Sequence, residues 1–240
     1  MLVEGAIAVK ACINNHKRDI ELVYIDKRKK TKDFNYIRKI IKENNIAFKE
    51  IESEEFLNIT NGKSHGGIVA EVGKRKYDKL IDGDIFYLDG IEDPFNLAYI
   101  IRTLYAFGIK NVILPLKDYS NMEGQLLKSS AGAYETMNIE IVDDVVSRIK
   151  ELKEKKYVTY ALKRGDDAKD IFEIEFSKKA IFMLGGEKRG ISSNLLELCN
   201  HYLYIPYGSD FRNSLNAAAA ADVVATLLFK QRKNDWIIRE

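Results

Sequence analysis

The sequence contains few of the residues that bind metals or form disulfides. Its 240 residues include two cysteines and three histidines, and neither an HExxH nor a CxxC pattern occurs. Zinc sites and Ser-His-Asp hydrolases depend on such residues, so we expect neither of them and no bound metal. Cys12 and Cys199 lie far apart in the chain. This usage is typical of the reducing cytoplasm, where we expect the protein to reside.

Long apolar runs are also missing. No stretch approaches the ~18–20 apolar residues that span a membrane. The first residues include an acid and no cleavable small-residue site, so we expect neither a membrane segment nor a signal peptide. Hydrophobic residues make up 46% and charged residues 31% of the chain, which excludes disorder, collagen and a disulfide scaffold. The length allows one large domain or two small ones.

The net charge of +2 conceals an asymmetry along the chain. Residues 1–80 contain 17 Lys and Arg against 12 Asp and Glu, whereas the remainder contains 21 against 24. A basic excess of this kind occurs in modules that bind nucleic acid. From charge alone, a lysine-rich solvated surface is the simpler explanation.

The first third of the chain predicts a small α/β unit. Residues 5–13 form an apolar, helix-favouring stretch, and residues 32–44 carry apolar side chains at helical spacing. Stretches rich in β-branched and apolar residues predict strands at 20–25, 47–51 and 68–72. The charged residues 73–79 then interrupt the pattern and predict a linker.

Strands and helices alternate in the rest of the chain. We expect strands at 85–88, 112–114, 139–142, 158–162, 180–184 and 202–205. We expect helices at 96–107, 122–128, 144–153, 193–199 and 214–231. The alternation predicts a parallel sheet with helices on both faces. Because such sheets bind ligands at the carboxyl ends of their strands, the chemistry should lie in the loops after the strands.

Two of these loops stand out. The first runs from Asp89 to Asn96 and enters a helix that carries Arg102, and we expect Asn96 to cap that helix. Taken alone, it also fits a plain strand, turn and helix with one exposed arginine. The second, residues 184–191, is rich in glycine, which lets a ligand approach the backbone. It lacks the P-loop and GxGxxG patterns, and turn chemistry leaves Glu187 unexplained.

A third loop, residues 205–216, precedes five consecutive alanines, 217–221. Alanine favours helix and permits close packing. We expect Ser214 to cap this last helix. In isolation, a capped alanine-rich core helix with no other role fits equally well.

Taken in order, the three loops resemble the three signature motifs of the SpoU/TrmH branch of the SPOUT RNA methyltransferases. The matching residues are Asp89, Asp93-Pro94, Asn96 and Arg102, then Gly185, Glu187 and Gly190, and finally Ile205-Pro206 with Ser214-Leu215-Asn216. Residues 130–133, Ser-Ala-Gly-Ala, also resemble a segment of that family. The resemblance covers roughly residues 84–231. Residues 5–9 and 64–70 resemble the substrate-binding domain of many members, which is similar to a small ribosomal-protein fold that grips bent RNA.

The resemblance implies a fold class that spacing alone does not. It implies an α/β protein with a C-terminal SPOUT domain, whose parallel sheet is flanked by helices and whose chain forms a deep trefoil knot, a feature otherwise nearly absent from proteins. A small N-terminal α/β domain would bind the RNA. We place this domain at residues 1–73, a linker at 74–82 and the SPOUT domain at 83–240. Family members are homodimers in which both subunits contribute to each active site, so we expect a homodimer.

The family also implies the cofactor, S-adenosylmethionine, held by the knotted loops largely through backbone groups. By position, the residues expected to bind it are Leu184, Gly185, Glu187, Gly190, Ile205, Ser214 and Leu215.

The implied reaction is methyl transfer to a ribose 2′-hydroxyl of RNA, which needs an aligned nucleophile and a route for its proton. The residues matching the family's catalytic cluster are Asn96, Arg102, Glu187, Ser214 and Asn216. Deprotonating an arginine such as Arg102 at pH 7 would cost on the order of 7 kcal/mol. We therefore expect Arg102 to grip a phosphate and lower the pKa of the hydroxyl electrostatically, with Glu187 orienting Arg102 or Asn96.

The chain departs from the family pattern in three places, one of which is the loop before Ser214, slightly lengthened by Phe211-Arg212-Asn213. Ala98 stands where many members have glycine after Asn-x, and Ala217-Ala218 replaces a Val-Ser pair. Two further residues keep two interpretations each: Arg212 can contact RNA or be solvated, and His65 can meet a base or phosphate or serve only the structure of its glycine turn.

The extra N-terminal domain favours ribosomal RNA as the substrate, because tRNA-specific relatives with a short architecture lack it. The alternatives are a tRNA or base methyltransferase of the same superfamily and a non-catalytic RNA-binding factor with the same fold. We expect RNA, not DNA or a membrane, as the partner.

Overall fold

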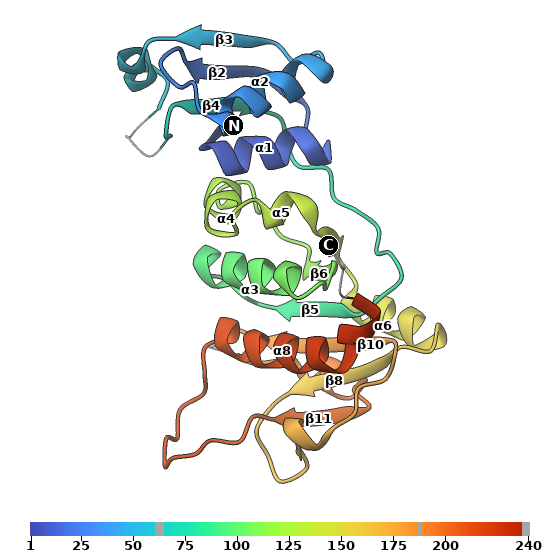
Figure 1. The fold of residues 1–240 in the computed structure, drawn as a ribbon. Coiled ribbons are helices and arrows are strands. Elements are labelled where there is room, and N and C mark those ends of the chain that lie inside the picture. Colours follow the sequence, from blue (N-terminus) through green and yellow to red (C-terminus); the bar gives the residue numbers. More distant parts are fainter. Residues whose placement is uncertain (61–64, 187–188, 237–240) are drawn as a thin grey trace. The chain divides into compact units, whose positions relative to one another are not determined.

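The computed structural model describes residues 1–60, 65–186 and 189–236 (Figure 1). Packing divides the chain into two units. The first comprises Met1–Lys76 with Asp118–Thr136, and the second comprises Tyr77–Lys117 with Met137–Glu240. Segment 118–136 thus packs with the N-terminal residues. The linear boundaries predicted above stay a prediction.

The first unit combines a four-stranded sheet with helices. Its strands, in the order β1-β4-β2-β3, are β1 (Leu2–Glu4), β2 (Ile20–Asp26), β3 (Phe48–Ile51) and β4 (Ile68–Val72). β4 runs antiparallel to β1 and β2, whereas β2 is parallel to β3. The helices are α1 (Ala6–Asn15), α2 (Lys32–Glu43), α4 (Glu123–Ser129), α5 (Ala133–Thr136) and the 3-10 helix η1 (Ser53–Asn58). The predicted helices and strands of residues 5–72 are confirmed; β1 and η1 were not anticipated.

The second unit contains a parallel seven-stranded sheet. Its strands, in the order β7-β6-β5-β10-β8-β11-β9, are β5 (Ile85–Asp89), β6 (Asn111–Pro115), β7 (Asn138–Val142), β8 (Val158–Leu162), β9 (Lys169–Asp170), β10 (Ala180–Gly185) and β11 (His201–Tyr204). Every pair of neighbouring strands is parallel. The predicted parallel sheet is therefore confirmed.

Side chains of successive strand residues point to opposite faces of this sheet. Both faces therefore present side chains on which helices can pack. The helices are α3 (Pro94–Ala106), α6 (Val145–Glu154), α7 (Ser193–Leu196), α8 (Ala217–Trp236) and the 3-10 helix η2 (Ile171–Glu173). Ile181 and Met183 of β10 pack in one core cluster with Ile149 of α6. Figure 1 shows α3 and α8 side by side along the sheet, and α8 contacts β10. No helix in the described part of the chain is long and apolar enough to cross a membrane.

Two predicted helices differ from the observed ones by three residues or more at an end. The helix expected at 193–199 ends at Leu196, because Leu198 and Cys199 donate their N–H groups to the carbonyls of residues three positions earlier, in tight turns. The helix expected at 214–231 begins at Ala217 and continues to Trp236.

A buried ion network holds segment 118–136 within the first unit. Arg18 donates from Nε to Glu135 Oε1 at 2.8 Å and from Nη1 to Glu123 Oε2 at 2.7 Å. Arg75 lies 3.9 Å from Glu135 and donates to the carbonyl of Tyr134 at 3.2 Å. The side chains of Arg18, Arg75 and Glu135 are fully buried. These ion pairs and hydrogen bonds join three segments that are distant in sequence, namely those that contain Arg18, Arg75 and residues 118–136.

We expect Arg18→Met to lower the free energy of unfolding by about 3–5 kcal/mol, because it leaves two carboxylates buried without their guanidinium. Lys39→Met is the matched control, since Lys39 pairs with Glu43 on the surface of α2 and such pairs contribute at most about 1 kcal/mol. Urea unfolding of both variants measures the losses. Equal losses would contradict a structural role for the network.

A second buried charge fixes α8 to the sheet. Asp84, which precedes β5, accepts from Ala180 N at 3.0 Å and from Arg232 Nε of α8 at 3.4 Å. Arg232 also donates to the carbonyl of Phe176. Burial raises the pKa of Asp84 to about 6, although the Arg232 guanidinium opposes this shift.

The raised pKa of Asp84 predicts a pH effect on stability. The folded chain keeps the proton of Asp84 at pH values where the unfolded chain has released it, so this group destabilises the fold as pH rises. Relative to Asp84→Asn, the unaltered chain should lose up to about 3 kcal/mol of unfolding free energy between about pH 3 and about pH 7. Urea unfolding across this range tests it, and a pH-independent difference would contradict it.

Candidate functional site

The loops singled out in the sequence meet at one edge of the parallel sheet. β5 and β10 are neighbours in parallel register, with Asp89 opposite Gly185 at their carboxyl ends. β8 lies on the other side of β10, and β11 lies beyond β8. Because all these strands point the same way, the loops that follow them leave from the same edge.

Glycine allows two of these loops to approach closely. A Cβ on Gly185 would lie 2.2 Å from the carbonyl carbon of Gly190, and a Cβ on Gly186 would lie 2.3 Å from the carbonyl oxygen of Gly90. Gly186 N donates to Asp89 O at 2.7 Å, and Gly190 N donates to Gly186 O at 2.9 Å. These contacts join the end of β10 to the end of β5 through backbone alone.

The glycine turn borders a cavity of ≈ 530 Å³, here called the loop cavity. Its lining includes every predicted cofactor residue that the structure describes, namely Leu184, Gly185, Gly190, Ile205, Ser214 and Leu215. Glu187, also predicted to bind the cofactor and to act in catalysis, lies outside the described residues. The volume is in the range of cavities that hold small organic ligands. Apolar side chains and glycine backbone together suit a flat apolar ring with polar edges.

A second cavity, ≈ 860 Å³, opens over the first motif loop, and we call it the motif cavity. Asp89, Glu92, Asp93 and Asn96 line one part of it. Asp89 is fixed there, because it accepts from Tyr87 Oη at 2.9 Å and from Ser192 N at 3.2 Å.

The two cavities share a wall. Gly186, Arg189, Gly190 and Ala217 line both of them. The two cavities therefore adjoin along the glycine turn, Arg189 and Ala217, so that ligands in them would lie next to each other at this border. This arrangement suits transfer of a small group from a molecule in one cavity to a molecule in the other.

The predicted catalytic residues fall in different places. Asn96 is half-buried in the motif cavity, and Ser214 is exposed at the loop cavity. Asn216 is exposed just before α8. Arg102 is exposed on α3 and lines neither cavity. It lies six residues after Asn96, about 120° further around the helix, so one chain does not bring Arg102 into its own cavities.

Both expected helix caps are wrong. Asp93, not Asn96, caps α3, accepting from Asn96 N at 2.8 Å, and Pro94 occupies the first turn. Proline is favoured there because that turn needs no N–H donor. Asn216, not Ser214, caps α8, because its Oδ1 accepts from Ala219 N at 2.8 Å. The side chains of Asn96 and Ser214 are thus not used as caps.

Sequence reasoning missed Arg164 and Tyr207, which also line the loop cavity. Arg164 follows β8, and Tyr207 follows β11. The rule that ligands bind after parallel strands applied equally to the loop after β8. The loop after β8 carries none of the three motifs, so only this general rule points to Arg164.

Two family models match the chain. The model described as "SpoU rRNA Methylase family" matches residues 84–226. The model described as "RNA 2'-O ribose methyltransferase substrate binding" matches residues 2–78. The first match alone spans more than half of the 240 residues.

Known proteins resemble the whole chain or its larger part. A protein of Staphylococcus haemolyticus assigned to the TrmH family of tRNA/rRNA methyltransferases is 28% identical over 244 residues, 97% of this chain and 96% of the relative. An AdoMet-bound rRNA methyltransferase from Sinorhizobium meliloti aligns with TM-score 0.76 at 18% identity, covering 97% of this chain and 87% of that chain. The A. aeolicus TrmH/SpoU tRNA modifying enzyme aligns with TM-score 0.59 at 21% identity, covering 66% of this chain and 79% of that chain. The two structures share the fold.

We expect Gly186→Ala to abolish measurable binding of S-adenosylmethionine (AdoMet), because the new Cβ would overlap the Gly90 carbonyl and force β5 and β10 apart at the shared wall. Gly208→Ala is the control, since a Cβ there meets nothing within 4 Å. Titration calorimetry with AdoMet compares the two, and circular dichroism verifies folding. Unchanged affinity in a folded Gly186→Ala chain would contradict the close approach.

Proposed function

The chain belongs to the SpoU rRNA methylase family, and from this membership we propose that it methylates a ribose 2′-hydroxyl of ribosomal RNA. It is an S-adenosylmethionine-dependent RNA methyltransferase. The observation that carries the proposal is the wall shared by the loop cavity and the motif cavity. Because the two cavities adjoin there, a methyl donor in one and a nucleotide in the other can come into the direct contact that methyl transfer requires.

We assign the methyl donor to the loop cavity. The residues fit it, because Leu184, Gly185 and Gly186 line the cavity with an apolar side chain and bare glycine backbone. Leu184, Ile205 and Leu215 provide apolar contacts for the adenine ring. When bound, S-adenosylmethionine supplies a methyl group on a positively charged sulfur. The loop cavity orients that group and excludes water from one side of it.

The target nucleotide is assigned to the motif cavity. Asn96 is among its lining residues, and its neutral amide is suited to hold the ribose or its phosphate by hydrogen bonds. Ser214 and Asn216 lie on the segment between the loop cavity and α8 and would position the nucleotide from that side. Glu187 keeps its predicted role of orienting Arg102 or Asn96.

Arg102 is assigned to the active site of a partner subunit. It shares an exposed stripe of α3 with Phe95 and Tyr99, which are 45% and 48% exposed. A second copy of the chain, packed on this stripe, would receive Arg102 at its own motif cavity. There the guanidinium would grip a phosphate and lower the pKa of the 2′-hydroxyl, since it cannot itself accept the proton at neutral pH. This assignment includes the expected homodimer.

Ribosomal RNA is favoured over tRNA by the extent of the similarity. The rRNA methyltransferase of Sinorhizobium meliloti aligns with 97% of this chain, whereas the tRNA modifying enzyme of A. aeolicus aligns with 66%. Residues 2–78 match a substrate-binding model, and a domain of this kind gives the enzyme a second grip on a large RNA. Such a role places the protein in the cytoplasm, where ribosomal RNA is found.

We also assign the trefoil knot to the second unit. β11 lies between β8 and β9, and the chain after it returns to form α8 against β10 and α3. Such a return supports threading of the C-terminal segment within the second unit.

The function is tested by incubating total RNA from a deletion strain with the purified chain and S-adenosylmethionine. Ribose methylation is expected at one nucleotide of ribosomal RNA, detected as resistance to alkaline cleavage. RNA from the parent strain should accept no methyl group there. A methylated base, a methylated tRNA, or cofactor binding without any transfer would each sink the proposal and support one of the alternatives.

We expect Arg102→Lys to lower kcat by about 100-fold or more with the affinity for S-adenosylmethionine unchanged, because a lysine cannot grip a phosphate through two nitrogens. Arg148→Lys, on α6, is the matched control and should keep full activity. Activity on ribosomal RNA and calorimetry give the two quantities. Near-normal turnover by Arg102→Lys would count against this role.

The assignment to a partner subunit has its own control. Inactive Arg102→Ala and Asn96→Ala chains, unfolded and refolded together, should regain activity, because a mixed dimer contains one site with both residues intact. No recovery would place Arg102 in its own chain's site.

A further inference from the structure

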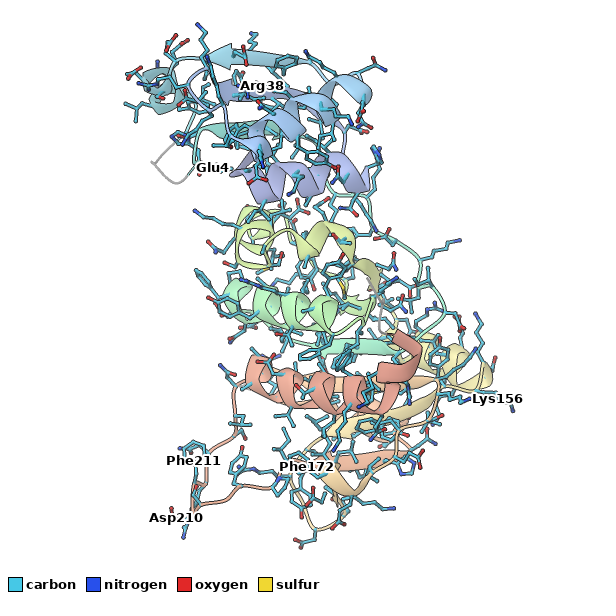
Figure 2. All side chains as sticks on the ribbon, viewed as in Figure 1. Glu4, Arg38, Lys156, Phe172, Asp210 and Phe211 are labelled. Carbon is cyan, nitrogen blue, oxygen red and sulfur yellow. The ribbon has the colours of Figure 1, made fainter. Side chains whose placement is uncertain are left out.

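The loop that carries Ser214 and Leu215 has little support of its own. Residues 208–216 are exposed, and they lie between β11 and α8 without regular structure. Figure 2 shows Asp210 and Phe211 at the outer end of this loop. Exposed loops of this kind open at low free-energy cost. A cavity wall made from such a loop is well formed only if other residues hold it.

Arg164 holds this loop from the turn after β8. Its Nη1 donates to the carbonyl of Arg212 at 2.5 Å, and its Nη2 donates to the carbonyl of Asn213 at 2.8 Å. These two carbonyls directly precede Ser214. A planar guanidinium can reach two successive carbonyls at once, which a lysine cannot.

Tyr207 completes the contact from within the loop. The Arg164 guanidinium lies 4.5 Å from the centroid of the Tyr207 ring, a cation–π distance. The Tyr207 hydroxyl accepts from Leu215 N at 3.0 Å. Residues 212, 213 and 215 are therefore all tied to one Arg164–Tyr207 pair, which itself lines the loop cavity.

The neighbouring Lys163 is used differently. Its Nζ lies 2.8 Å from Asp167 Oδ2 and 4.2 Å from the centroid of the Tyr202 ring. The two consecutive basic residues thus have separate partners within the protein. This pattern favours a structural clamp over a basic patch for RNA.

We propose that Arg164 and Tyr207 are positioning residues that hold Ser214 and Leu215 in place, so that the loop cavity is formed before S-adenosylmethionine binds. This rests on the proposed function only in placing the methyl donor in the loop cavity. A preformed wall spares the ligand the entropy of ordering the loop, and it therefore raises affinity. The clamp acts on cofactor binding and leaves the grip on RNA to other residues.

The test measures affinity for S-adenosylmethionine by calorimetry and affinity for RNA by filter binding. Arg164→Ala should weaken cofactor binding about tenfold or more, and Tyr207→Phe, which keeps the ring but loses the hydroxyl, about threefold. Arg164→Lys should regain little of the cofactor affinity that Arg164→Ala loses, because lysine keeps the positive charge but not the planar guanidinium with its two donor nitrogens. The KM for S-adenosylmethionine should rise in all three variants, with RNA affinity close to that of the unaltered chain.

Arg212→Ala is the matched control. Arg164 bonds to the backbone carbonyl of residue 212, so removing the Arg212 side chain leaves that bond in place. Cofactor affinity should stay unchanged. Thermal unfolding of every variant verifies that the fold is kept.

Unchanged cofactor affinity in folded Arg164→Ala would overturn the proposal. Weakened RNA binding with unchanged cofactor binding would also overturn it, and would make Arg164 an RNA contact. Base methylation by the unaltered chain would defeat the proposed function alone, because the clamp is measured by cofactor affinity. Failure of the unaltered chain to bind S-adenosylmethionine would overturn both.

Discussion

The candidate site depends on a contact between two pieces of backbone. Gly186 meets the carbonyl of Gly90, and Gly185 meets Gly190, at distances that leave no room for a Cβ. The contact joins the ends of two neighbouring parallel strands and forms the wall between the loop cavity and the motif cavity. Any side chain there would overlap the opposing backbone and disrupt the border between the two cavities. The proposed chemistry therefore depends on the absence of side chains at Gly185 and Gly186.

Much of this arrangement follows from the sequence by simple rules. Alternating strands and helices indicate a parallel sheet, and the parallel direction gathers the loops after Leu88, Leu184 and Tyr204 at one edge. Other features of the structure are not indicated by any local pattern in the sequence. Asp93 and Asn216 cap helices where Asn96 and Ser214 were expected, because a cap depends on backbone angles that neighbouring residues decide together. Strand order and the packing of segment 118–136 depend on distant contacts, which periodicity does not record.

Charged residues of the first unit contribute to its packing and not only to any binding of RNA. The basic excess of residues 1–80 includes Arg18 and Arg75, which are buried against Glu135. On the surface, Lys27 pairs with Glu52 and Arg38 with Glu50. A count of basic residues therefore overstates the positive potential that faces solvent. Lys29 and Lys30, both exposed, stand in the turn after β2.

The packing of segment 118–136 also sets an order of events during synthesis. N-terminal domains generally fold as soon as they leave the ribosome. Here Arg18 and Arg75 emerge long before Glu123 and Glu135, their carboxylate partners. The first unit completes its core only once α5 has been translated, when β5, α3 and β6 have also emerged. Arg18 and Arg75 thus wait through that interval before they can meet these carboxylates, and the first unit cannot form its buried ion network until then.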